Sequence, residues 1–316
     1  MFFAVIADVH GNLPALRAVM ADAMARGAEG FLFAGDYCVS APWADGVVDV
    51  MRGLPQAVCV RGNEERYLHL PDGDDAQFAV SRWTARSMKK ENIAWLDALP
   101  EEVLLLRDGV EIRMAHSSEA FIGDAELRDF KTRKLIWRYP HTVSQAERLA
   151  DMRAVMESDT GFMARVAELE RGVYVFGHTH SQWHLQFGDV LLLNPGSCGL
   201  AVDCGEPGAP YTLLRVENGT WRVEERRVKY DIEATIADVK RSGQYAAAPE
   251  WSEMIFAEWR TGREMALYML RYIDAYARRI GDDRRPFMAD TWAAGFAAWR
   301  AEPSPWVMVE AGDFPK

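Results

Sequence analysis

A chain of 316 residues with 49% hydrophobic residues can bury a sizeable core, either as one large domain or as a catalytic domain with an appendage. Its 36 basic and 47 acidic side chains give a formal net charge of −11 at pH 7, which argues against an electrostatic grip on polymeric nucleic acid. No stretch approaches the roughly 20 apolar residues that a membrane-spanning helix needs, so we do not expect a membrane protein.

The beginning of the chain repeats one pattern three times. MFFAVIADVHGN, EGFLFAGDY and QAVCVRGNE are each a short apolar run that ends in a polar cluster. Between the first two, LPALRAVMADAMARG has apolar residues at helical spacing, and Gly27 stands just past its end. Strands that alternate with helices predict parallel βαβ units, whose strands are covered on both faces.

Two later runs have the same character. GVEIRMAHSS ends at His116, and GVYVFGHTH ends in His178 and His180. Residues 142–170, between them, are predicted to be helical. Alternating polarity and the turn signals GD and NG then predict antiparallel strands from WHLQFGDVLLLNPGS through YTLLRVENGTWRVEERRVKYD.

Strand patterns stop at Asp231. DIEATIADVKRSG is predicted to be a helix closed by Gly243, and FMADTWAAGFAAW is predicted to be another. Between them, residues 250–281 carry one helical apolar stripe of Ile255, Trp259, Ala266, Met269, Ile273, Ala277 and Ile280. We therefore predict a catalytic domain over residues 1–230 and a helical C-terminal extension over residues 231–316, with the boundary near 231–249.

Five tryptophans of this extension stand at helical spacings: Trp251, Trp259, Trp292, Trp299 and Trp306. Such stripes usually pack, so we expect a core or a homodimer contact through the C-terminal helices. The alternative is a lid that narrows the catalytic cleft and selects substrates.

The N-terminus and the cysteines indicate the cellular compartment that we expect for the protein. MFFAVIADVH lacks the basic start of a signal peptide, and Asp8 interrupts its apolar run. The four cysteines show no zinc-binding CxxC spacing, so we expect them to be reduced. We therefore expect a cytoplasmic protein.

Polar side chains follow five of the predicted strands, where ligands bind in open α/β sheets. They are Asp8-Val9-His10, Gly35-Asp36, Gly62-Asn63, His116 and His178-Thr179-His180. Imidazole nitrogens with side-chain oxygens suit Mn, Fe, Zn, Ni or Co ions better than Mg²⁺ or Ca²⁺. Seven ligands are too many for one tetrahedral ion and suit two divalent ions that share a carboxylate. Glycines Gly35, Gly62 and Gly177, each directly before a ligand, would let the backbone leave its strand sharply.

The series DVHGN, GDY, RGNE, AHSS and GHTH resembles the calcineurin-like metallophosphoesterases, whose pattern is DxH…GD…GN[HC][DE]…H…GHxH. The resemblance covers roughly the first 230 residues, in the right order and spacing. NPGSCG and the later RVKYD resemble the small bacterial and archaeal branch, which includes phosphodiesterases. The resemblance implies a four-layer α/β/β/α sandwich with a dinuclear metal centre. It implies that one metal is held by Asp8, His10 and His180, that the other is held by Asn63, His116 and His178, and that Asp36 bridges them.

Other interpretations of single residues and of the whole chain stay open. Asp8 with Asn12 is compatible with a helix cap, a lone Asp36 with a turn, and a lone His116 with a strand end. An aspartyl-phosphate phosphatase would carry a second aspartate where His10 stands. A metal-free scaffold of the same fold would be expected to have lost ligands. The remaining histidines, His69, His141 and His184, are expected at the surface or behind the ligands.

Two residues depart from the family pattern. Glu64 stands where the family commonly has the histidine that protonates the leaving group, and Ser117 stands where it often has glycine. An unperturbed glutamic acid is ionised near neutral pH, and two cations favour ionisation further. Glu64 is therefore expected to orient an imidazole or a water rather than to donate a proton.

The candidate catalytic residues are Asp36, Asn63, Glu64 and His116. We expect a metal-dependent phosphoesterase in which a hydroxide bridging two metals attacks phosphorus, with no covalent enzyme intermediate. The expected substrate is a small phosphorylated metabolite or nucleotide, with a preference for diesters. The alternative activity is that of a phosphomonoesterase.

Overall fold

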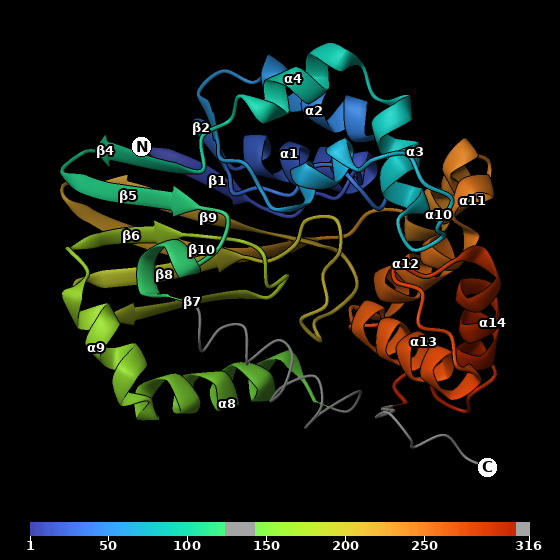
Figure 1. Cartoon of the computed structure of the whole chain (residues 1–316). Coiled ribbons are helices and arrows are strands. Elements are labelled where there is room, and N and C mark those ends of the chain that lie inside the picture. The colour runs from blue at the N-terminus through green and yellow to red at the C-terminus, as the bar shows by residue number, and fades with distance from the viewer. Residues whose placement is uncertain (124–142, 308–316) are drawn as a thin grey trace.

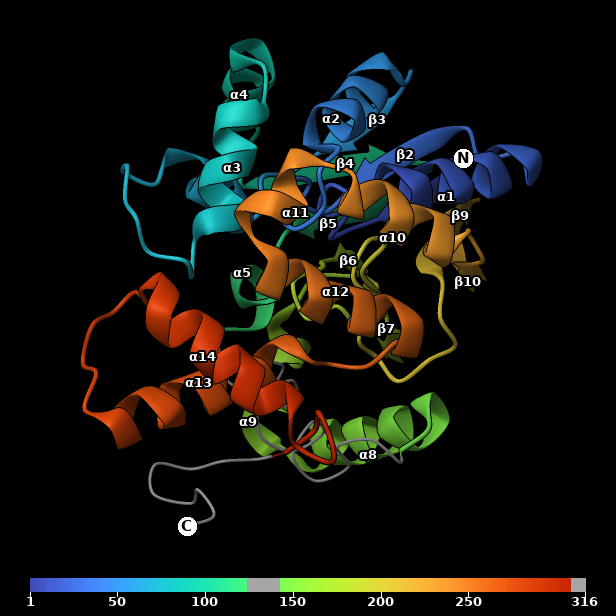
Figure 2. The same cartoon turned by 90° about the vertical axis from the view of Figure 1, so that its right-hand side faces the viewer.

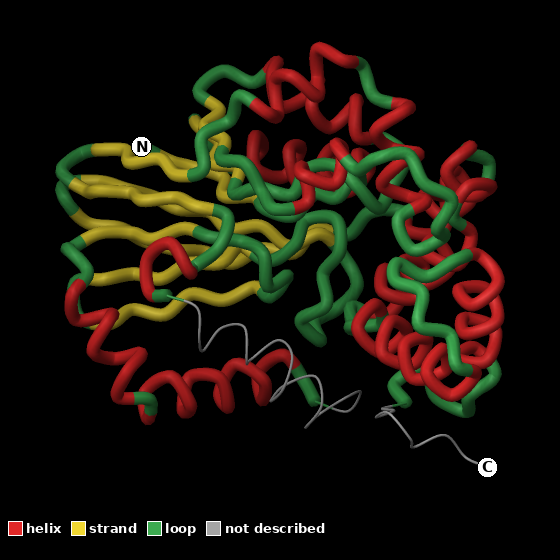
Figure 3. The backbone as a smooth tube through the Cα atoms, in the orientation of Figure 1, coloured by secondary structure: helices red, strands yellow, loops and turns green. Residues whose placement is uncertain are grey.

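Two five-stranded sheets pack face to face in the computed structural model, which describes residues 1–123 and 143–307 (Figures 1 and 3). The first sheet contains, in spatial order, β10 (Thr220–Val228), β9 (Ala209–Glu217), β1 (Phe2–Ile6), β2 (Gly30–Phe33) and β3 (Ala57–Cys59). The second contains β4 (Glu102–Arg107), β5 (Val110–Ala115), β6 (Gly172–Val175), β8 (Val190–Pro195) and β7 (Gln182–Phe187).

The strand directions follow the sequence patterns. The three N-terminal strands β1, β2 and β3 are parallel, and so are β5, β6 and β8. The pairs β7–β8 and β9–β10 are antiparallel, as the turn signals predict. Strand β4 was not predicted; it pairs antiparallel with β5 at the sheet edge, where Leu104 and Leu106 are 54% and 66% exposed. An edge strand with apolar residues on its open face lacks the alternation that marks a half-buried strand.

Apolar clusters hold four layers together. The outer face of the first sheet is covered by α1 (Leu13–Ala25), α2 (Ala44–Gly53), α3 (Ala79–Ser87) and α4 (Lys90–Asp97). The outer face of the second sheet is covered by α5 (Glu119–Ile122), α8 (Gln145–Ser158) and α9 (Thr160–Glu168). Side chains such as Val5, Leu32, Ile112 and Val175 fill the space between the sheets. The α/β/β/α sandwich implied by the sequence is confirmed.

The helix expected over residues 142–170 is two helices where the structure describes it. Asp159 separates α8 from α9, and its side chain accepts a hydrogen bond from Phe162 N at 2.8 Å. That bond satisfies one of the amides that a helix start leaves unpaired, so a new helix begins there.

The C-terminal extension contains α10 (Ile232–Lys240), α11 (Gly243–Ala247), α12 (Pro249–Thr261), α13 (Ala266–Ile280) and α14 (Ala289–Arg300). Gly243 begins α11 and does not merely close α10. The continuous stripe predicted over residues 250–281 is wrong, because Gly262 adopts a φ of +63° and separates α12 from α13. Ile280, at the end of that stripe, is 52% exposed.

The extension has its own apolar core. Trp259, Trp292 and Trp299 are buried there, and Trp251 and Trp306 pack against it. Two side chains of the sandwich, Ala41 and Leu200, belong to the same cluster. These tryptophans thus pack within one chain, while a lid and a homodimer both stay predictions.

Figure 1 places the extension at the end of the sandwich toward which the arrowheads of β5 and β6 point. Figure 2, seen from that end, shows α12 lying across the strand ends.

All four cysteines are free thiols. Within residues 1–123 and 143–307, no helix combines the length and the hydrophobicity that crossing a bilayer demands.

Candidate metal centre

The five polar blocks meet at the carboxyl ends of the strands that precede them. Donor atoms of Asp8, His10, Asp36 and His180 form one group, and those of Asp36, His116 and His178 form another, each within 4.8 Å. Asp36 belongs to both groups. Asn63 lies beside the second group, with its Oδ1 at 2.9 Å from His116 Nε2. The structure therefore brings together all seven side chains that the sequence singles out.

In the first group, two imidazoles face each other. The Nε2 atoms of His10 and His180 are 3.0 Å apart, and Asp8 Oδ1 lies 3.7 Å from His180 Nε2. Both oxygens of Asp8 accept a hydrogen bond from His178 N, at 3.0 and 3.1 Å, which fixes the carboxylate. Converging nitrogen and oxygen donors of this kind fit a divalent transition metal.

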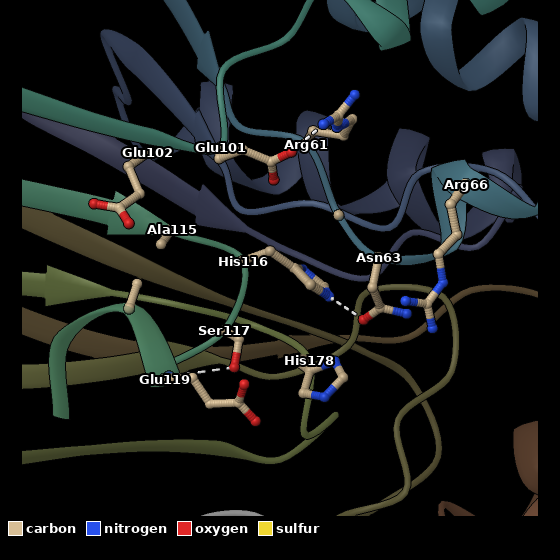
Figure 4. A pocket seen from close by; sticks show the side chains of 12 residues that line it. Arg61, Asn63, Arg66, Glu101, Glu102, Ala115, His116, Ser117, Glu119 and His178 are labelled. Atoms are coloured by element: carbon tan, nitrogen blue, oxygen red, sulfur yellow. Dashed lines mark hydrogen bonds and ion pairs between the residues drawn. The ribbon is translucent and has the colours of Figure 1, made fainter. Parts of the chain in front are cut away.

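In the second group, the ring of His116 is oriented by the backbone. Its Nδ1 is 2.8 Å from Ala34 O, and it can only donate to that carbonyl. In the neutral ring its Nε2 then presents a lone pair toward Asn63 Oδ1 and toward Asp36 Oδ2, which is 3.3 Å away. Acceptors that point at one another need a cation or a proton between them, so this group also fits a metal ion. Figure 4 shows His116 and Asn63 pointing at each other, with His178 beside them.

The backbone of the predicted ligands is unusual. Positive φ angles of 51° to 67° occur at Asp8, His10, Asp36, His178 and His180. Non-glycine residues rarely adopt this region, and those that do concentrate at functional sites. The ligands themselves therefore make the sharp turns that the sequence analysis assigned to the preceding glycines.

The preceding glycines serve two different purposes. Gly35 has a positive φ of 92°, as expected. Gly62 does not have a positive φ; a Cβ there would lie 2.2 Å from Asp36 N, so the position requires glycine for space. The expectation of conformational freedom at Gly62 is wrong for this reason. It is also wrong at Gly177, which has no positive φ and where a Cβ would lie 2.7 Å from Ala7 Cβ.

Charge is concentrated at the centre. Burial alone would lower the pKa of His10, but Glu64, Asp36 and Asp8 raise it to about 9. For His116, burial is likewise outweighed by Asp36 and Asp8, and the pKa rises to about 10. Burial opposes ionisation of Asp36, yet the neighbouring His116 and His10 hold its pKa well below the usual range. The carboxylates thus attract positive charge to this point.

Glu64 lies next to one of the predicted ligands. Its Oε2 is 3.2 Å from His10 Nδ1, an ion-pair distance without good hydrogen-bond alignment. Its backbone N–H donates to Asp36 Oδ1 at 2.8 Å. Glu64 thus lies close to an imidazole, and its role in orienting that ring stays a prediction.

Sequence reasoning missed the contribution of Glu65. This buried carboxylate accepts hydrogen bonds from Tyr37 N at 2.7 Å and from Gly62 N at 2.8 Å, so it joins the loops that carry Asp36 and Asn63. Burial, and then the charge of Asp36, raises its pKa to about 7. The paired carboxylates of RGNEE were the available signal.

Two further residues, Asn12 and Ser197, support the Asp8 loop. The side chain of Asn12 caps α1 by accepting from Ala15 N at 3.1 Å, and it also donates to Gly199 O at 3.2 Å. The Ser197 hydroxyl donates to Asp8 O at 2.7 Å. The helix-cap interpretation is thus right for Asn12, and NPGSCG supports the site by hydrogen bonding.

Two of the remaining histidines, His69 and His184, lie away from the centre. His69 pairs with Asp97 and His184 pairs with Glu225 at the surface, each at 2.7 Å. His141 lies outside the described residues.

Two cavities open onto the centre and share Asn63 and His178. The larger cavity has a volume of about 450 Å³. Its lining includes the basic residues Arg61 and Arg66, the acidic residues Glu101, Glu102 and Glu119, and Ser117 (Figure 4). The smaller, of about 160 Å³, extends from His10 and His180 toward the C-terminal helices.

Residues 1–219 match the calcineurin-like phosphoesterase superfamily domain. The chain belongs to that superfamily. It is therefore a metallophosphoesterase, a metal-dependent phosphoester hydrolase, and the aspartyl-phosphate alternative is set aside.

Relatives of this metallophosphoesterase match over most of their length. An uncharacterized protein of Methanocaldococcus jannaschii is 27% identical over 255 residues, which are 78% of this chain and 94% of the relative. A metallophosphoesterase from Sphaerobacter thermophilus shares the fold with a TM-score of 0.55 and 22% identity, over 82% of this chain and all of that one. A hypothetical protein from Pyrococcus horikoshii has a TM-score of 0.57 and 18% identity, over 83% of this chain and 99% of that one.

Proposed function

We propose that this metallophosphoesterase is a phosphodiesterase that uses two divalent transition-metal ions and acts on a small phosphorylated metabolite or nucleotide. One ion would be held by Asp8, His10 and His180, and the other by Asn63, His116 and His178. The observation that carries the proposal is that Asp36 belongs to both donor groups. When bound, such ions make water nucleophilic near neutral pH and offset negative charge on the phosphoryl oxygens.

The chain prepares this arrangement with its own hydrogen bonds. Ala34 O fixes the ring of His116, and His178 N fixes the carboxylate of Asp8. Glu65 ties the two loops that carry Asp36 and Asn63. Ligands held in this way need little reorganisation when metal and substrate bind.

The preference for a diester is supported by the two cavities. A phosphodiester has two substituents and a monoester has one. A phosphorus atom placed between Asn63 and His178 would have a cavity on each side for a substituent. In a monoesterase, the alternative, one cavity would have no substituent to bind. A metal-free scaffold, the other alternative, would not require seven donor side chains to converge at one point.

We expect bis(p-nitrophenyl) phosphate to be hydrolysed faster than p-nitrophenyl phosphate, and alkyl monoesters slowest. Glu64 is a carboxylate where a proton donor is common in the family, so leaving groups that need no proton are favoured, and a general acid is typically worth about 10²–10⁴-fold. A dianionic monoester is also repelled more strongly by Glu64 than a monoanionic diester. Initial rates with Mn²⁺, Ni²⁺, Zn²⁺ and Mg²⁺ test this, and a preference for alkyl monoesters would exclude the diesterase assignment.

We expect small esters to be better substrates than DNA or RNA. The net charge of −11 supplies no long-range attraction for a polyanion. The same assay with single- and double-stranded DNA tests this expectation. Higher catalytic efficiency on DNA than on every small ester would contradict it.

Glu64→Gln is expected to weaken metal binding by about 10–100-fold, the usual cost of removing a carboxylate partner from a metal-bound histidine. The amide keeps the size of the side chain but loses the charge beside His10 Nδ1. Competition with a fluorescent chelator measures the metal affinity directly. Glu225→Gln is the matched control, because Glu225 pairs with the surface histidine His184 and should leave the affinity unchanged. Equal metal affinity in both variants would show that Glu64 does not act through His10.

A further inference from the structure

The smaller cavity is built jointly by the metal centre and the helical extension. On one side stand His10 and His180. On the other stand the apolar side chains of Trp251 and Met254 from α12, Leu267 from α13, and Leu200 and Val202 from the loop after β8. The extension therefore forms one wall of the catalytic cavity.

Hydrogen bonds fix this wall to the loops that carry the predicted ligands. Trp259 Nε1, on α12, donates to Gly199 O at 2.7 Å, and Gly199 N donates to Asp8 O at 3.0 Å. Trp251 Nε1 lies 3.4 Å from Ser40 Oγ, on the loop that follows Asp36. These hydrogen bonds tie the wall to the loops that carry the predicted ligands.

The cavity also contains carboxylates, and the extension engages those it contributes. Glu258 accepts hydrogen bonds from Met265 N at 2.9 Å and Ala266 N at 3.0 Å, and Glu264 accepts from Leu267 N at 2.9 Å. These amides lie at the N-terminal end of α13, where negative charge is stabilised by the helix. Glu258 and Glu264 thus accept hydrogen bonds from the start of α13, and the apolar side chains of the wall are the groups that would contact a ligand.

We propose that Trp251, Met254 and Leu267 form a subsite for a compact apolar substituent of the substrate. The proposal rests on the proposed function, because it places the phosphoryl group at the metal centre. The larger cavity, with Arg61 and Arg66, differs in chemistry and takes the polar substituent. The substrate class is then an unsymmetrical phosphodiester with one small apolar group.

Three phosphonates with equal numbers of heavy atoms test this subsite: propylphosphonate, 2-hydroxyethylphosphonate and 2-aminoethylphosphonate. Their Kd values for the Mn²⁺-loaded protein are measured by isothermal titration calorimetry. Propylphosphonate should bind most tightly. Its Kd should be about five-fold lower than that of 2-hydroxyethylphosphonate, which is the usual effect of burying one more apolar group. Trp251→Ala should remove this preference while leaving the hydroxyethyl affinity nearly unchanged.

Two further variants make the test independent of folding defects. Leu267→Ala truncates a half-buried residue of the same wall and should also reduce the preference. Trp221→Ala truncates a half-buried tryptophan on β10, beside Gln186, and should leave all three Kd values unchanged. The melting temperature and the metal content of each variant are recorded, and Leu267→Ala decides if Trp251→Ala does not fold.

Two results would overturn the subsite. Tightest binding of 2-aminoethylphosphonate would mean that the carboxylates govern the cavity. An unchanged propyl preference in both Trp251→Ala and Leu267→Ala would mean that the apolar group binds elsewhere. Either result can accompany rapid diester hydrolysis, whereas failure of the proposed function would appear as an absence of diester hydrolysis by metal-loaded wild type.

Discussion

Asp36→Asn is expected to lower kcat/KM for bis(p-nitrophenyl) phosphate by about 10³-fold, because metal ions contribute several kcal/mol to stabilising transition-state charge. Asp36 is the residue common to the two donor groups, and its carboxylate also receives the N–H of Glu64. An amide presents one oxygen and no negative charge, so it cannot serve two cations equally. Steady-state kinetics with a saturating series of Mn²⁺ concentrations measures the loss.

The matched control for this variant is Asp97→Asn. Asp97 is an exposed aspartate that pairs with His69 at 2.7 Å, and its replacement should leave kcat/KM unchanged. If Asp36→Asn retained the turnover and the metal content of the wild type, the assignment of Asp36 as a bridge between two metals would be wrong.

Deletion of residues 250–316 is expected to yield insoluble protein. The deletion removes the buried Trp259, Trp292 and Trp299 and uncovers Ala41 and Leu200 of the sandwich. Replacing one buried aromatic residue by alanine typically costs about 3–5 kcal/mol, whereas the whole stability of a domain is about 5–15 kcal/mol. Expression followed by separation of soluble and pelleted protein gives the answer.

A soluble truncated enzyme would indicate a different role for the extension. If it kept its metal content and hydrolysed diesters with a changed substrate preference, the extension would be a lid that is dispensable for folding. The hydrogen bond from Trp259 to Gly199 O argues for the first outcome, because it ties the extension to the loop that supports Asp8.

The candidate metal centre was predictable because its parts are local in the sequence. Each predicted ligand follows a short apolar strand, and the carboxyl ends of parallel strands meet at one edge of a sheet. The ligand spacing of DVH and GHTH is therefore visible without a structure. The four-layer sandwich followed from the family resemblance, whereas the strand and helix pattern by itself predicted parallel βαβ units.

The supporting interactions were not predictable in the same way. Glu65 acts through backbone amides of Tyr37 and Gly62, and nothing in its neighbourhood in the sequence shows which amides a buried carboxylate will reach. The break at Gly262 was missed because the apolar residues of α12 and α13 happen to continue one helical period across it. Trp251 and Leu267 line the same cavity as His10 although they lie far from it in the sequence, so the wall depends on the folded structure.

The central claim is a centre of two metal ions, and metal stoichiometry tests it most directly. Purified protein is stripped of metal, reconstituted with Mn²⁺, freed of unbound ions and analysed by plasma mass spectrometry alongside a diester hydrolysis assay. Two donor groups that share Asp36 predict about two ions per chain, with activity that rises as the second site fills. Full activity with one ion per chain, or with none, would contradict this account.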